Sequence, residues 1–119
     1  MAFPTINYKY NGVAEAEALA TLMDAKCTAF EKYIGDAVAS CDVEFEKVTA
    51  QQNGKVFRVE ANLMLDGKLF RAEATEESFE EAIDEVRDEL DKELRRAKTK
   101  QETLHKQAGR AMKEQMVGA

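Results

Sequence analysis

The chain has 119 residues, of which 45% are hydrophobic and 34% charged, and its formal net charge is −6 at pH 7. This length and composition suit one globular domain and exclude a disordered chain or a collagen-like repeat. No apolar run approaches the ~20 residues that a membrane helix needs. Residues 1–4 lead directly into a strand-like segment, so we expect no signal peptide and a cytoplasmic location.

The first predicted elements are a strand and an amphipathic helix. Apolar and polar residues alternate over residues 5–10, which is typical of a strand with one buried face. Asn11 and Gly12 interrupt this alternation. In residues 13–34 the large apolar side chains recur every three or four positions, which predicts a helix. Gly35 then stands where a glycine commonly ends a helix.

Three further strands are predicted after this helix. An alternation of apolar and charged residues begins at Cys41 and recurs in residues 57–65 and 69–75. The dipeptides between these segments are typical of hairpin turns: Asn53-Gly54 and Asp66-Gly67. The sequence therefore predicts an antiparallel three-stranded meander.

The last predicted element is a long helix that begins with a cap. Ser78 is followed three residues later by Glu81, which is the capping-box pattern. Apolar residues then recur at helical spacing at least to Lys98. Residues 101–119 keep only a weak apolar stripe, and we expect either a helical extension or a mobile tail there. We therefore predict one domain in residues 1–100, followed by this tail.

The order of the predicted elements is β-α-β-β-β-α, which defines an α+β fold. The first strand–helix–strand connection is long enough to place its two strands parallel. Both helices must bury an apolar face, whereas one face of the sheet is lined by charged side chains. We therefore predict a four-stranded mixed sheet with two helices packed on one face.

Residue patterns typical of catalysis or metal binding are scarce. The sequence has no glycine-rich phosphate loop, and its single histidine, His105, leaves a Cys/His zinc site without enough ligands. The carboxylates of residues 76–91 fit a solvated helix face. Cys27 and Cys41 alternate with apolar neighbours, so we expect reduced core thiols. We expect no enzyme activity, no metal, no cofactor and no small-molecule substrate.

Charge is distributed unevenly along the chain. Residues 1–91 contain 9 Lys+Arg and 20 Asp+Glu, a net charge of −11. Residues 92–119 contain 8 Lys+Arg and 3 Asp+Glu, a net charge of +5. An acidic body with a basic end suggests a polyanionic partner that meets one end of the molecule.

The basic end contains a row of cations at helical spacing. Lys92, Arg96 and Lys100 are four residues apart and share one helix edge, with Arg95 and Lys98 nearby. Such a row suits the phosphate groups of RNA or of another polyanion. It also suits a solvated helix end whose cations complement the helix dipole. Spacing alone leaves both interpretations open.

Four segments occur in an order that matches a known family. They are Phe-Glu-Lys-Tyr at residues 30–33, the strand pair at residues 57–75, Ser-Phe-Glu-Glu-Ala-Ile-Asp at residues 78–84, and Leu-Asp-Lys-Glu-Leu-Arg-Arg-Ala-Lys-Thr-Lys at residues 90–100. Together they resemble the ribosome hibernation-promoting factor and ribosome-associated inhibitor family. The resemblance covers about residues 5–100 and is to the short form of that family.

The resemblance implies a fold akin to a double-stranded-RNA-binding domain. It also implies binding to the small ribosomal subunit and its rRNA, in the channel that mRNA and tRNA use, which silences idle ribosomes. We expect a monomer in the free state. The family's cationic helix positions, with their neighbours, imply the following RNA-binding residues: Lys26, Lys32, Lys92, Arg95, Arg96, Lys98 and Lys100.

The sequence departs from the family pattern at four helix positions. Glu89 and Ala29 stand where the family has lysines, Ala20 where it has an arginine, and Glu80 where it has an aromatic residue. An alternative function is therefore an acidic protein-interaction module that docks a basic protein. Acidic residues on the open sheet face, away from the cations, favour the ribosome-binding hypothesis. Acidic residues around the cations favour the alternative.

Overall fold

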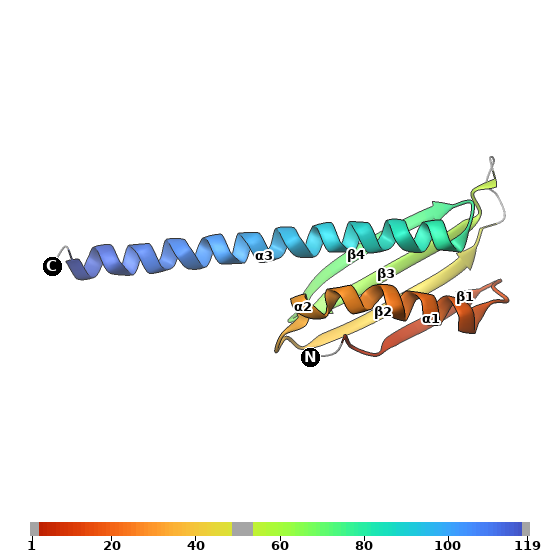
Figure 1. Cartoon of the computed structure of the whole chain (residues 1–119), viewed down its shortest axis with the longest axis horizontal. Coiled ribbons are helices and arrows are strands. Elements are labelled where there is room, and N and C mark those ends of the chain that lie inside the picture. The colour runs from red at the N-terminus through yellow and green to blue at the C-terminus, as the bar shows by residue number, and fades with distance from the viewer. Residues whose placement is uncertain (1–2, 49–53, 118–119) are drawn as a thin grey trace.

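The computed structural model describes residues 3–48 and 54–117 and has the α+β fold expected from the sequence. Four strands form one sheet in the order β1-β2-β3-β4, and the helices cover one of its faces (Figure 1). The strands are β1 (Ile6–Asn11), β2 (Ala39–Lys47), β3 (Phe57–Leu65) and β4 (Lys68–Glu76). The helical segments are α1 (Ala16–Cys27), the 3₁₀ turn η1 (Thr28–Phe30), α2 (Glu31–Ile34) and α3 (Phe79–Val117).

The sheet is mixed, as predicted. β1 pairs with β2 in parallel, and β2 with β3 and β3 with β4 pair antiparallel. The parallel pair arises because α1 carries the chain back along the sheet between β1 and β2. The register places Tyr8 beside Val43, Val43 beside Ala61, and Ala61 beside Ala72. Such rows line the face that the helices cover.

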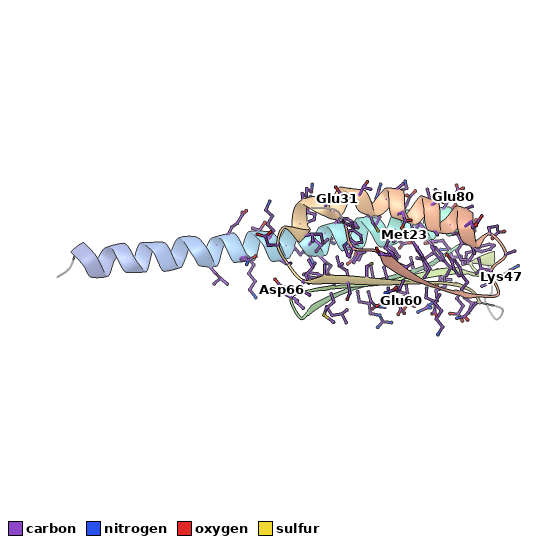
Figure 2. All side chains as sticks on the ribbon, turned by 90° about the horizontal axis from the view of Figure 1, so that it is seen from below. Met23, Glu31, Lys47, Glu60, Asp66 and Glu80 are labelled. Carbon is purple, nitrogen blue, oxygen red and sulfur yellow. The ribbon has the colours of Figure 1, made fainter. Side chains whose placement is uncertain are left out.

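The core lies between this sheet face and the helices. Phe45 and Leu63 of the sheet, Met23 of α1 and Leu90 of α3 are fully buried. Figure 2 shows Met23 between α1 and the sheet, and Glu60 on the opposite, open face. Cys27 and Cys41 are buried and free, which confirms the prediction of reduced core thiols.

The first predicted helix is shorter than expected and is interrupted. α1 begins at Ala16 rather than at residue 13, and its regular turns end at Cys27. The Thr28 hydroxyl donates a hydrogen bond to the Ala25 carbonyl oxygen (2.7 Å), and the chain tightens into η1 before α2. A threonine hydroxyl that bonds the backbone in this way competes with regular helix geometry. Gly35 ends α2 with a φ of +53°, as predicted.

The two predicted hairpin turns have different outcomes. Asp66 and Gly67 join β3 to β4 with φ values of +47° and +83°, which is the geometry of a type I′ turn. The Asn53-Gly54 turn falls partly outside the described residues. The register pairs Lys47 with Phe57, so the connection between β2 and β3 is longer than the predicted two-residue turn.

α3 is the longest element and projects beyond the sheet (Figure 1). Its predicted cap is confirmed, because the Glu81 backbone N–H donates a hydrogen bond to Ser78 Oγ (3.1 Å). Residues 101–117 continue the helix. The projection makes the molecule 67 × 30 × 20 Å, with a radius of gyration of 18.6 Å. A compact domain of this length has about 13.5 Å.

Candidate nucleic-acid interface

The predicted row of cations forms one exposed surface on α3. Lys92, Arg95, Arg96 and Lys100 line a shallow depression together with Thr99. All five side chains are exposed, and they lie where α3 leaves the sheet. The i, i+4 spacing of the sequence thus becomes a continuous cationic strip, which we call the α3 strip.

The α3 strip does not lie at a helix end. α3 continues to Val117, and its last turn contains no basic residue. The favourable interaction of cations with a helix dipole falls off within the last turn. Dipole complementation therefore does not account for the cations between Lys92 and Lys100.

Arg95 is held by a network that links α3 to α2. Arg95 Nε lies 3.0 Å from Asp91 Oδ2, and the Tyr33 hydroxyl donates a hydrogen bond to Asp91 Oδ1 (3.3 Å). The arginine side chain is nevertheless 65% exposed. Its guanidinium therefore keeps donors directed at solvent, which suits a phosphate oxygen.

A groove beside the α3 strip contains two further predicted cations, Lys32 and Lys98. Lys32 of α2 and Lys98 and Lys100 of α3 line it, and Lys68 of β4 faces them. Lys68 is a cation that the sequence analysis missed. Its position directly after the Asp66-Gly67 turn is a signal for an exposed strand end, but not for proximity to α3.

Lys26 differs from the other predicted residues because its charge is paired. Its Nζ lies 2.9 Å from Asp84 Oδ1 of α3, and its side chain is 29% exposed. The structure therefore separates Lys26 from the α3 strip and from the groove. Its predicted contact with RNA stays a prediction.

The open face of the sheet carries a network of carboxylates around Arg58. The Arg58 guanidinium pairs with Glu44 (3.0 Å), Glu46 (3.1 Å), Glu73 (3.1 Å) and also with Glu60. The hydrogen bond from Arg58 to Glu73 raises the pKa of the arginine, so it stays charged. Figure 2 shows Glu60 on this face, away from the helices.

The acidic groups described here form two sets, one on the open sheet face and one on α3. The open-face carboxylates point away from the helices that carry the α3 strip. Other carboxylates lie among the predicted cations: Asp84 beside Lys26, Asp91 beside Arg95, Asp66 in the groove, and Glu89 and Glu93 on α3 next to Lys92. The carboxylates on the open face match the arrangement expected for ribosome binding, whereas those on α3 match the one expected for the acidic module.

Metal-binding clusters and membrane-spanning helices are absent from the described part of the chain. It contains no group of three His, Cys, Asp or Glu residues placed to hold a metal ion. None of its helices has the length and apolarity needed to cross a membrane.

A comparison with known protein families identifies the family of this chain. Residues 6–102 match the family described as sigma 54 modulation protein / S30EA ribosomal protein. The chain belongs to this family. The resemblance seen in the sequence is thereby confirmed, and the match ends within α3, before its last turns.

Solved structures support the fold assignment of this S30EA family member. The N-terminal domain of Protein Y from Thermus thermophilus is 20% identical, with a TM-score of 0.64 over 81% of this chain and 98% of that one. A ribosomal subunit interface protein from Coxiella burnetii is 21% identical, with a TM-score of 0.65 over 79% of this chain and 97% of that one. At these identities the likeness concerns the fold. No curated protein matches the chain.

Proposed function

We propose that this protein is a ribosome-associated translation inhibitor, or hibernation factor, that binds the small ribosomal subunit. The observation that carries the proposal is the exposed α3 strip in the middle of a helix, on a member of the S30EA family. Lys92, Arg95 and Arg96 hold phosphates of the rRNA, and the folded body occludes the mRNA and tRNA channel. The mechanism is occlusion, so no bond is made or broken. The protein works in the cytoplasm.

The other predicted cations contribute less to RNA binding in this proposal. Lys98, Lys100 and Lys32 add positive charge beside the strip, which attracts rRNA without placing it in the groove. Lys26 contributes less, because Asp84 already neutralises its charge. The alternative, an acidic module for a basic protein, is weakened because Arg58 pairs with four of the open-face glutamates.

The test removes three cations of the strip together. A variant with Lys92→Ala, Arg95→Ala and Arg96→Ala is expected to bind small subunits more weakly. Each lost phosphate contact should reduce the slope of log affinity against log salt by about 1. The measurement is co-sedimentation with small subunits at several salt concentrations, with circular dichroism as a control of folding. These side chains are exposed, so the fold should persist.

A matched control separates local contacts from net charge. Lys9, Lys47 and Lys55 are also exposed but lie in or beside the strands. Their joint change to alanine alters the net charge equally, and it should leave the salt slope close to that of the parent. If the strip variant is folded and binds as the parent does, the proposed contact surface is wrong.

A charge reversal provides the opposite test. Glu89 precedes the strip on α3 and is exposed. Glu89→Lys should tighten binding and steepen the salt dependence, because it replaces repulsion of a phosphate by attraction. Glu77→Lys makes the same change of charge before α3 begins, and it should have a smaller effect.

A further inference from the structure

Among the residues whose side chains the structure describes, four large hydrophobic ones remain exposed, three near the β3–β4 turn and one on α3. Val38, Met64, Leu69 and Leu104 are 80%, 36%, 52% and 55% exposed. Met64 and Leu69 are cross-strand neighbours beside the β3–β4 turn, and Val38 bonds Asp66 of that turn. Leu104 lines the groove with residues of the same turn. Leu63 and Phe70 face the core, so Met64 and Leu69 point to the open side of the sheet. Of the four exposed side chains, Leu104 is the one that lines the groove.

The groove at this end combines an apolar floor with a cationic rim. Its volume is about 580 Å³, which lies in the range of ligand-binding clefts. Leu65, Ala97 and Leu104 contribute to the floor. The rim contains the lysines already described, Lys32, Lys68, Lys98 and Lys100.

Asp66 is the one carboxylate among the described residues that line the groove, and it is already engaged. Asp66 Oδ1 accepts a hydrogen bond from the Val38 backbone N–H (2.8 Å). The four lysines thus outnumber the acidic groups that line the groove. The resulting positive charge favours an acidic occupant. The apolar floor favours an occupant that also has aliphatic side chains.

The aromatic rings of the groove do not favour a nucleic-acid base. Lys68 Nζ lies over the ring of Phe70 at 5.3 Å, and Phe70 is buried. Lys32 Nζ lies over the ring of Tyr33 at 5.1 Å. Bases of single-stranded RNA bind by stacking on open aromatic faces. Here a lysine ammonium lies over one face of each of these two rings.

We propose that this groove docks an acidic amphipathic helix of a partner protein. The leucine face of such a helix covers Leu65, Ala97 and Leu104, and its glutamates meet the lysine rim. The projecting part of α3 provides the wall along which the partner helix lies. This mode is the helix-in-groove recognition used by many peptide-binding domains. The proposal does not depend on RNA binding by Lys92, Arg95 and Arg96.

The probe is a synthetic peptide of about 18 residues, or five helical turns. It contains leucine, glutamate and alanine, with every leucine on one helical face. One control peptide has the same composition with the leucines spread around the helix. A second control keeps the leucine face but replaces glutamate by lysine. Oligouridylate RNA serves as the third ligand.

Binding is measured by fluorescence anisotropy of labelled peptide with the full chain. Amide chemical shifts of the ¹⁵N-labelled protein then locate the site. The acidic amphipathic peptide should shift amides of the β3–β4 turn and of residues 94–104, and both control peptides should bind more weakly. Lys68→Glu and Leu104→Gln should each weaken binding by about tenfold. Lys47→Glu, the same charge change at the far end of β2, should change it less than twofold.

Three results would overturn the proposal. The first is no shift in the groove at about 1 mM acidic peptide. The second is equal binding of the acidic peptide and either control peptide. The third is oligouridylate binding that shifts the same amides and is weakened by Lys68→Glu, which would make the groove part of the RNA surface. The variant that lacks Lys92, Arg95 and Arg96 should still bind the peptide. Such a result would show that peptide binding does not require the α3 strip, on which the proposed function depends.

Discussion

The ammonium of Lys26 on α1 lies 2.9 Å from Oδ1 of Asp84 on α3. Asp84 Oδ1 is buried and has no hydrogen-bond partner among the described residues, so Lys26 provides its compensating charge. The pair joins two helices whose covered faces rest on the same sheet. Lys26, which the sequence predicts to bind RNA, therefore also has a role in the fold.

A double-mutant cycle tests this role. Lys26→Ala should lower the free energy of unfolding by about 0.5–1 kcal/mol, because half of the Asp84 side chain is exposed and solvent screens the pair. Asp84→Ala in the Lys26→Ala background should then cost less than it does alone. Urea titration of the four proteins provides the measurement. Additive effects of the two changes would show that the ion pair contributes nothing.

Acid should weaken the network on the open sheet face. Hydrogen bonds from Asn62 and Arg71 lower the pKa of Glu60 from 4.5 to about 2. A lowered pKa in the folded state stabilises the protein above the unfolded value, and this contribution is lost as the pH falls from 4.5 towards 2. Glu60→Gln should therefore flatten the dependence of unfolding free energy on pH in this window.

A second variant isolates the cause of the pKa shift of Glu60. Asn62→Ala removes the hydrogen bond to Glu60 Oε1 (3.0 Å) and leaves the carboxylate in place. The pKa of Glu60 should rise towards its ordinary value, and less stability should be lost in acid. Urea titrations at several pH values provide the test. An unchanged acid dependence in Glu60→Gln would contradict the assignment of this effect to Glu60.

The leucines of α3 test which helix face is buried. Leu90 is fully buried, whereas Leu104 is 55% exposed on the same helix. Leu90→Ala should cost about 2–5 kcal/mol of unfolding free energy, because it leaves a cavity in the core. Leu104→Ala is the matched control and should stay within about 0.5 kcal/mol of the parent. Similar losses for both leucines by denaturant titration would refute the assigned face.

The two thiols should be inert in the native protein. Cys27 and Cys41 are 1% and 0% exposed, and burial raises the pKa of each thiol to about 12. The reactive species is the thiolate, which is therefore scarce at neutral pH. Labelling by a thiol reagent should be slow without denaturant and fast in urea. Rapid labelling of both thiols under native conditions would contradict the buried placement.

Much of the fold follows from local sequence patterns. Alternation predicts the strands and a three-to-four spacing predicts the helices, because each period follows from the geometry of one element. The type I′ turn at Asp66-Gly67 was predictable because its positive φ angles select those residues. The break after Cys27 was not, because it depends on a hydrogen bond of Thr28 within a run that remains apolar at helical spacing.

The row of Lys92, Arg96 and Lys100 can be predicted without the fold, since residues four apart on one helix share an edge. Tertiary structure decided which other charges lie near that row. It pairs Lys26 with Asp84, and it brings Lys68 to a groove shared with Lys32 and Lys98. These partners are 30 or more residues apart in the chain. Only the packing of the helices and the β3–β4 turn around one sheet brings their charges close, and no local period encodes that packing.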